Sequence, residues 1–276
     1  MSTPTPEDDP RARSIRARCH ELAPVAGELE RNLAVIEASI ADAVASGVRL
    51  LVLPELATSG YYLTPEEAQA CAFQLDAPHF ARWARILPPD GVLVTGFVER
   101  HGGVLFNSAA VITAAGVAGV YRKTHLWDAE ADLFRPGDLA PPIVDTPVGR
   151  LGLLICYDLE FPEMPRRLAL AGADLIAVPT NWPLVPRPDG EHPPEVIQAM
   201  AAARASAIPI LCCDRRGAER GSEWTEGTAA VGSDGWLVGR KNGDGVLDVT
   251  VSLSPTRTKI GERNDVFHDR RPELYA

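Results

Sequence analysis

The stretch Leu151-Gly-Leu-Leu-Ile-Cys-Tyr-Asp-Leu-Glu-Phe-Pro-Glu163 joins an apolar run, a cysteine and the start of a helix. The run 151–155 is typical of a buried strand, and Pro162 stands where proline is tolerated, in the first turn of a helix. We therefore expect the Cys156 thiol at the rim of a sheet. A strand that leads into a helix also indicates an α/β fold.

Two further reactive side chains follow apolar strands in the same way. Glu55 comes after the run 49–54, and Lys123 comes after the run 117–122. An acid, a base and a nucleophile at the ends of three strands are the groups that covalent catalysis needs. Together with Cys156, they predict a cysteine hydrolase.

Strand and helix patterns alternate along the chain. Between Glu28 and Ser46, apolar residues recur at steps of three and four, which predicts an amphipathic helix. No linker or repeat interrupts the pattern, so we predict one α/β domain over residues 14–276, after a flexible polar tail over residues 1–13. The other predicted helices lie within 65–87 and at 162–171 and 193–206, and the strands at 15–22, 49–53, 92–98, 105–113, 117–121, 151–155, 175–178, 208–213 and within 227–253.

Composition narrows the class of protein. The 276 residues are 46% hydrophobic and 23% charged, as in ordinary globular proteins. The net charge of -10 argues against nucleic acid or an anionic membrane surface as the main partner. No apolar run approaches the roughly 18 residues of a membrane helix, so we expect no membrane partner.

The five cysteines lack the spacing of metal ligands. There is no C-x-x-C, and the adjacent pair Cys212 and Cys213 does not suit a zinc site with four ligands. We expect this pair in the core, at the end of an apolar run. Reduced thiols predict a cytoplasmic protein, and no metal or other cofactor is expected.

Three stretches that hold the reactive residues resemble the carbon–nitrogen hydrolase, or nitrilase, superfamily. They are LVLPELATSGYY at 51–62, YRKTHLWDAE at 121–130 and LLICYDLEFPE at 153–163. Similar stretches such as DRRGAERG at 214–221 extend the resemblance over almost all of the chain beyond the tail. The resemblance implies a four-layer α-β-β-α sandwich, a small-molecule amide substrate, and homodimers or higher homo-oligomers.

The resemblance also implies catalytic roles. A free thiol has a pKa of about 8.5, so a base must remove its proton before it attacks an amide. Glu55 would be that base for Cys156. Lys123, with the backbone N–H of Tyr157, would stabilise the oxyanion. Glu130 occupies the position of a second family glutamate, seven residues beyond the lysine. This glutamate would orient the lysine or the substrate.

Other residues near these motifs have predicted supporting roles. Asn181 and Trp182 follow the strand next to the cysteine strand, and they are predicted to line the substrate pocket, with turn and packing roles as the alternative. Asp158 is predicted to accept backbone N–H bonds in the turn after the cysteine. His125 is predicted to be structural.

The predicted reaction is the hydrolysis of a small carboxamide to a carboxylic acid and ammonia, through a thioester on Cys156. The pair Tyr157-Asp158 after the cysteine is similar to amidases that act on small aliphatic amides, whereas true nitrilases have Trp-Glu there. Nitrilase activity and N-carbamoyl amino acid or amine hydrolysis remain alternatives, and Arg187 is a candidate carboxylate clamp. From other classes, an acyltransferase and a non-catalytic binding relative also remain.

Overall fold

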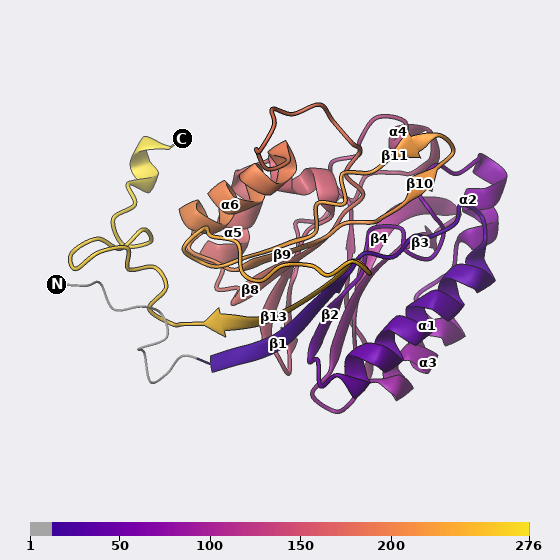
Figure 1. The fold of residues 1–276 in the computed structure, drawn as a ribbon, viewed down its shortest axis with the longest axis horizontal. Helices are drawn as coiled ribbons and strands as arrows, with labels where there is room; N and C mark the ends of the chain where they lie inside the picture. The colour runs from indigo at the N-terminus through magenta and orange to yellow at the C-terminus, as the bar shows by residue number, and fades with distance from the viewer. Residues whose placement is uncertain (1–12, 276) are drawn as a thin grey trace.

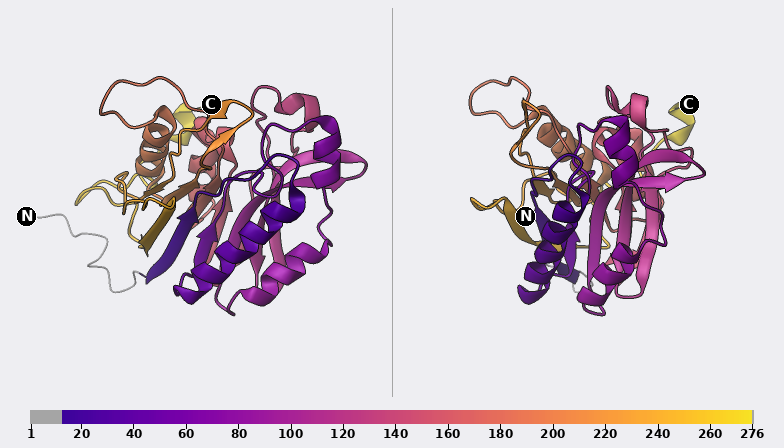
Figure 2. Two further views of the ribbon diagram at one scale, coloured as in Figure 1. Left: turned by 45° about the vertical axis from the view of Figure 1, so that its right-hand side comes forward. Right: turned by 90° about the vertical axis from the view of Figure 1, so that its right-hand side faces the viewer.

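Two β-sheets lie face to face between layers of helices. The computed structural model describes residues 13–275. Figures 1 and 2 show α1 and α3 outside one sheet and α5 and α6 outside the other. The predicted four-layer α-β-β-α sandwich in a single domain is therefore confirmed. The helices are α1 (Leu29–Ala45), α2 (Pro65–Cys71), α3 (Pro78–Ile86), α4 (Glu130–Leu133), α5 (Glu163–Leu170) and α6 (Pro194–Ser206).

The larger sheet has the strand order β13-β1-β2-β3-β4-β5. Its strands are β1 (Arg13–His20), β2 (Leu50–Val52), β3 (Val92–His101), β4 (Val104–Thr113), β5 (Gly116–Arg122) and β13 (Val246–Leu253). The neighbours β1, β2 and β3 are parallel, and the other pairs are antiparallel. Side chains alternate along β2, so that Leu50 and Val52 face the other sheet while Leu51 packs with α1 and α3.

The smaller sheet has the strand order β12-β9-β8-β7-β6. Its strands are β6 (Ile143–Thr146), β7 (Gly149–Leu153), β8 (Leu175–Pro179), β9 (Ile210–Cys213) and β12 (Ala229–Val231). The central strands β7, β8 and β9 are parallel, with α5 and α6 as their crossovers. Residues that follow β7 and β8 therefore emerge at the same edge of the sheet. A short hairpin of β10 (Ala218–Glu219) and β11 (Ser222–Glu223) lies outside both sheets.

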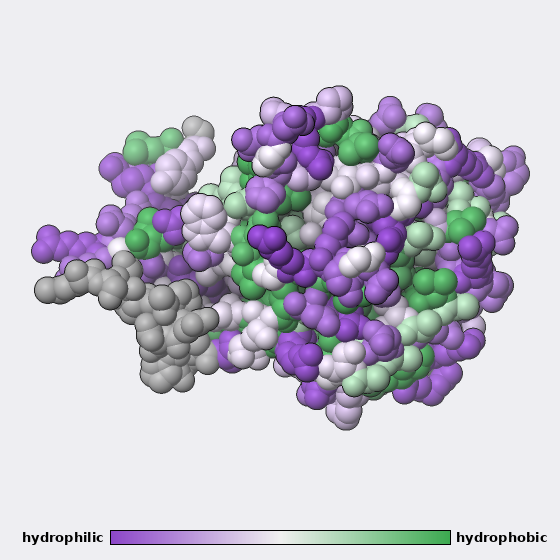
Figure 3. Space-filling model, in the orientation of Figure 1, coloured by the Kyte–Doolittle hydropathy of each residue, from purple (hydrophilic) through white to green (hydrophobic). Residues whose placement is uncertain are grey.

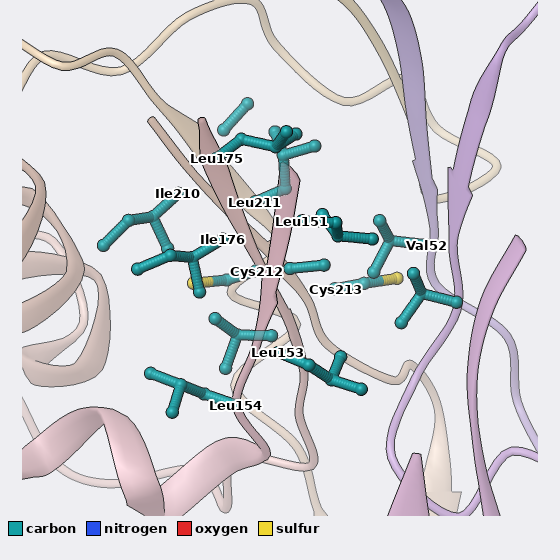
Figure 4. Close-up of a cluster of buried hydrophobic side chains, with 14 of the residues drawn as sticks. Val52, Leu151, Leu153, Leu154, Leu175, Ile176, Ile210, Leu211, Cys212 and Cys213 are labelled. Atoms are coloured by element: carbon teal, nitrogen blue, oxygen red, sulfur yellow. The ribbon is translucent and has the colours of Figure 1, made fainter. Parts of the chain in front are cut away.

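The two cysteines at the end of β9 lie in the apolar core. Figure 4 shows the sulfur of Cys213 pointing toward Val52 of the larger sheet, and the sulfur of Cys212 on the opposite side of the strand, near Ile176. Both side chains are fully buried. The prediction that they are core residues is confirmed, and they join the two sheets and the α5–α6 layer into one packed interior.

The cysteine strand is shorter than predicted. β7 ends at Leu153, and a 3-10 helix over Cys156–Glu160 precedes α5. The reason is local, because Asp158 Oδ2 accepts the N–H of Ile155 at 3.1 Å. A side chain thus replaces the strand partner that would have continued the sheet. Pro162 stands just before α5 rather than inside it.

The start of β1 and the segment after β13 lie on one side of the sandwich. β1 begins at Arg13, the last residue of the predicted tail, and residues 1–12 lie outside the described residues. After β13 the chain extends away from the sandwich to a short 3-10 helix over Pro272–Leu274. Phe267 of this segment packs against the core and lies under the guanidinium of Arg166, 4.8 Å from the ring centroid. Figure 3 shows a face of the body that mixes polar and apolar side chains. None of the helices in residues 13–275 combines the length and the hydropathy that a transmembrane span requires.

Candidate active site

The four predicted catalytic residues meet where strands of both sheets end. Glu55 follows β2, Lys123 follows β5, Cys156 follows β7, and Glu130 begins α4. The side chains of Glu55 and Lys123 are fully buried, and Glu130 and Cys156 are only 5% and 6% exposed. Two sheets and one short helix therefore contribute to a single buried centre.

Lys123 lies between two carboxylates. Its Nζ donates hydrogen bonds to Glu55 Oε1 and to Glu130 Oε1, each at 2.7 Å. Burial disfavours the ammonium, but the charges of Glu55 and Glu130 outweigh burial and raise the pKa of Lys123 above its ordinary value. The amine therefore carries a fixed positive charge inside the protein.

The carboxyl group of Glu55 has a raised pKa. Burial, together with the nearby charge of Glu130, raises the pKa of Glu55 to about 7, although Lys123 acts in the opposite direction. Asn107 Nδ2 donates to Glu55 Oε1 at 2.7 Å, and Oε2 has no hydrogen-bond partner among residues 13–275. A carboxylate with a pKa near neutrality is well matched to proton transfer at pH 7.

Cys156 has an unusual backbone conformation and a thiol with a raised pKa. Its φ of 45° lies in the left-handed region, which residues other than glycine rarely adopt. Burial is the main cause that raises the pKa of the Cys156 thiol, Glu55 raises it further, and Lys123 opposes this rise. The thiol donates a hydrogen bond of 3.8 Å to the backbone oxygen of Asn181. A nearby base must therefore remove its proton before it can attack.

Asp158 braces the turn that carries the nucleophile. Its Oδ1 accepts the backbone N–H of His125 at 3.1 Å, while its Oδ2 holds the N–H of Ile155. The prediction that Asp158 accepts backbone N–H bonds is confirmed. The His125 ring stacks on Phe161 at 3.8 Å and its Nδ1 lies 2.8 Å from Asp158 Oδ1, in agreement with a structural role. Asp158 thus ties the cysteine turn to the segment just after Lys123.

Gly96 of β3 allows the backbone of Glu55 to approach closely. A Cβ atom at Gly96 would lie 2.3 Å from the nitrogen of Leu56 and 2.6 Å from the Cα of Glu55. The N–H of Gly96 donates to the oxygen of Pro54 at 3.1 Å. Any side chain at position 96 would therefore displace the base.

Comparison with known proteins identifies the family. A family model described as carbon-nitrogen hydrolase matches residues 16–259. The chain belongs to the carbon–nitrogen hydrolase family. The prediction of an enzyme of this family, with amidases among its relatives, is confirmed.

Relatives resemble this hydrolase over most of their length. A nitrilase from Pyrococcus abyssi is 34% identical over 90% of this chain and 94% of its own. An (R)-stereoselective amidase from Pseudomonas sp is 34% identical over 91% of this chain and 89% of its own. The solved structure of an amidase from Nesterenkonia sp. has a TM-score of 0.78 at 28% identity, covering 95% of both chains. In a mutant of that amidase, the acetamide moiety of fluoroacetamide is covalently added at the active-site cysteine.

The three predicted substrate-binding residues take different places in this hydrolase. Asn181 follows β8, and its Nδ2 donates to the backbone oxygen of Glu55 at 2.9 Å. Trp182 is buried in the apolar core. The Tyr157 ring is partly exposed and packs edge-on against Trp127 at 4.9 Å. Asn181 is therefore in contact with catalytic groups, and substrate contact by all three residues stays a prediction.

Two polar residues of the centre were missed at the sequence level. Tyr61 donates its hydroxyl proton to Glu130 Oε1 at 2.6 Å, the same oxygen that accepts a bond from Lys123. Asn107, in the middle of β4, fixes Glu55. The available signal for Tyr61 was its position, six residues after Glu55 in the stretch 51–62. Asn107 lies in the stretch FNSAAVI at 106–112, which also resembles the family.

A cavity of about 330 Å³ opens beside the catalytic centre. Tyr61 lines the cavity and also belongs to the catalytic centre. Burial and the charges of Glu130, Glu55 and Cys156 raise the pKa of its hydroxyl. The lining of the cavity contains aromatic rings and carboxylates, and none of the described lining residues is Arg or Lys. The lining residues are Tyr61, Tyr62, Leu63, Pro65, Trp127, Asp128, Ala129, Glu130, Asp132, Leu133 and Phe134.

Metal ligands do not cluster in the described part of the chain. Residues 13–275 contain no group of three or more His, Cys, Asp or Glu side chains placed to hold a metal ion. The ion pairs of the catalytic centre join Lys123 to Glu55 and to Glu130.

The activity of the hydrolase toward amides should fall as the pH drops below about 7. Glu55 has a raised pKa, so its carboxylate is the form present above about pH 7, and only that form can take the proton of Cys156. We expect kcat/KM, measured between about pH 5 and about pH 9, to fall about tenfold per pH unit on the acidic side.

The matched control for this profile is Asp214, a second carboxyl whose pKa burial raises to about 7. Asp214→Asn should leave the midpoint of the acidic limb unchanged. If the limb disappears in that variant, or if the wild-type profile is flat down to about pH 5, the assignment of the base to Glu55 is wrong.

Proposed function

We propose that the protein hydrolyses small carboxamides to carboxylic acids and ammonia, with Cys156 as the nucleophile. The observation that carries the proposal is the buried contact of Lys123 with Glu55 and Glu130, beside a cysteine in a left-handed turn. A fully buried ion pair contributes little to stability that apolar residues of similar volume could not supply, so the burial of this lysine between two carboxylates indicates a chemical role. A fixed cation beside a base and a thiol suits acyl transfer.

The first half of the reaction forms a thioester. Glu55 takes the proton of the Cys156 thiol, and the sulfur attacks the amide carbon. The ammonium of Lys123 and the backbone N–H of Tyr157 stabilise the negative charge on the carbonyl oxygen. Glu55 then gives its proton to the amide nitrogen, the C–N bond breaks, and ammonia leaves.

The second half of the reaction releases the acid. Glu55 removes a proton from a water molecule, which attacks the thioester carbon. The oxyanion forms again beside Lys123, the C–S bond breaks, and the thiolate recovers a proton from Glu55. The second carboxylate, Glu130, holds the lysine in place throughout, since it shares the ammonium with Glu55.

The lining of the cavity favours an amide substrate that carries no carboxylate over an N-carbamoyl amino acid. Its volume of about 330 Å³ lies at the lower end of the range for ligand pockets. A substrate carboxylate would meet Asp128 and Asp132 there and, among the described lining residues, no cation. Arg187, the candidate clamp, is exposed on the loop after Trp182 and is not one of these lining residues.

A thioester should be detectable on Cys156. Intact-mass spectrometry of enzyme quenched during turnover of a small amide should show an acyl adduct that maps to Cys156. The adduct and the turnover should be lost in Cys156→Ala and kept in Cys71→Ala, which changes a buried cysteine of α2. Wild-type turnover by Cys156→Ala would contradict the mechanism. With hydroxylamine added, hydroxamate in excess of acid would indicate an acyltransferase instead.

Simple amides should be better substrates than nitriles or carbamoyl compounds. The assay is ammonia release from a panel of aliphatic amides, ω-amino amides, matched nitriles and N-carbamoyl compounds at equal concentrations. We expect the highest kcat/KM for an amide. A nitrile or a carbamoyl compound with a kcat/KM about tenfold above that of the best amide would overturn the substrate assignment.

A homodimer or higher homo-oligomer in the cytoplasm is also proposed. The segment that extends from the sandwich after β13 exposes Ile260, Leu274 and Tyr275, which a second copy of the chain would cover. The five cysteines are free, as expected for a reducing compartment. Light scattering should give a molar mass of at least twice 29.7 kDa, and cell fractionation should recover the protein with the cytoplasm. A monomer mass or a membrane-bound fraction would contradict these proposals.

A further inference from the structure

A buried ion pair lies outside the catalytic centre and contacts residues that line the neighbouring cavity. Arg215 follows β9 and Glu219 belongs to β10, and both side chains are almost fully buried, at 1% and 5% exposure. Arg215 Nη1 donates to Glu219 Oε2 at 2.9 Å, and its Nη2 donates to the backbone oxygen of Pro24 at 2.9 Å. The guanidinium also lies over the Trp224 ring, 4.5 Å from its centroid.

The second oxygen of Glu219 holds the backbone of the cavity wall. Glu219 Oε1 accepts the N–H of Tyr61 at 2.9 Å and the N–H of Tyr62 at 2.7 Å. The preceding residue, Gly60, has a φ of 79°, and a Cβ there would lie 2.7 Å from Glu219 Oε2. The two hydrogen bonds and the close approach of Gly60 therefore hold the backbone at Tyr61 and Tyr62 against the Glu219 carboxylate.

Trp224 and the two tyrosines form an aromatic cluster around the same corner. The Trp224 ring meets the Tyr61 ring edge-on at 5.4 Å and lies 5.6 Å from the Tyr62 ring. These contacts fix the direction of the Tyr61 ring once its backbone is held. The hydroxyl of that ring then reaches Glu130 Oε1 at 2.6 Å.

We propose that Glu219, held by Arg215, is a positioning residue for catalysis. It fixes the backbone of Tyr61, so that the Tyr61 hydroxyl holds Glu130 in place against Lys123. The proposal rests on the proposed function in one respect, that Lys123 and Glu130 take part in the hydrolysis. Buried ion pairs can often be replaced by apolar residues of similar volume without loss of stability, so the contacts of this pair with the cavity wall suggest a role beyond folding.

A double-mutant cycle tests this chain of contacts. The four proteins are the wild type, Glu219→Gln, Tyr61→Phe and the double variant. Glu219→Gln keeps an oxygen for the two N–H groups but loses the charge that pairs with Arg215, and Tyr61→Phe removes only the hydroxyl. We expect each single change to lower kcat for propionamide about tenfold, with a smaller change in KM. In the Tyr61→Phe background, Glu219→Gln should lower kcat less than about twofold further.

A second readout does not depend on the natural substrate. The rate at which iodoacetamide alkylates Cys156, followed by intact mass, reports how well the catalytic groups activate the thiol. The same cycle should show the same non-additive loss in this rate. If no amide is turned over but the alkylation cycle is non-additive, the proposed function fails while the positioning role stands.

The control is an ion pair between β1 and β13, with a buried arginine and a partly exposed aspartate, that makes no contact with Glu219 or Tyr61. Arg18 of β1 is 4% exposed and pairs with Asp248 of β13 at 2.6 Å. Asp248→Asn should lower the thermal stability while leaving kcat and the alkylation rate unchanged. If Glu219→Gln does not fold, as judged by circular dichroism, Arg215→Lys takes its place in the cycle, because it keeps the charge with a different geometry.

Two results would overturn the proposal. One is an unchanged kcat and alkylation rate in the folded Glu219→Gln or Arg215→Lys variant. The other is a double variant in which the two losses multiply, since full additivity would mean that Glu219 does not act through the Tyr61 hydroxyl.

Discussion

The burial of Lys123 between two carboxylates is the interaction on which the site depends. A lone ammonium with no exposure to water would give up its proton, and a lone carboxylate in the same place would take one. The contacts of 2.7 Å to Glu55 and Glu130 keep all three groups within reach of one another. The end of β2, the end of β5 and the start of α4 are therefore tied together by charge as well as by packing.

Burial and these charges together set the resting state of the nucleophile. Burial is the main cause that raises the pKa of both Glu55 and Cys156, and the ammonium of Lys123 opposes the rise at both groups. In the proposed mechanism the thiol begins neutral and transfers its proton to the carboxylate of Glu55. This differs from cysteine enzymes in which a neighbouring cation holds a preformed thiolate at low pKa.

Much of the fold, and the meeting of the four candidate residues, was predictable from the sequence and its family motifs. The apolar runs before Glu55, Lys123 and Cys156 mark strands that end at the site, and the family motifs relate the three. The contacts that orient them were not predictable, because they join residues far apart in the chain. Glu219 and Tyr61 are 158 positions apart, and Asn107 and Glu55 are 52 apart. Likewise, the early end of β7 depends on where the Asp158 side chain points, which an apolar pattern does not encode.

Gly96 has a further consequence for how this architecture can vary. The location of Glu55 depends on direct backbone-to-backbone approach at a point where no side chain fits. A change in the aromatic wall of the cavity leaves that approach untouched, since the wall is built by Tyr61, Tyr62 and Trp127 rather than by β3. The placement of Glu55 is thus independent of Tyr62 and Trp127, and these two rings can be exchanged to suit a new amide while Glu55 keeps its position.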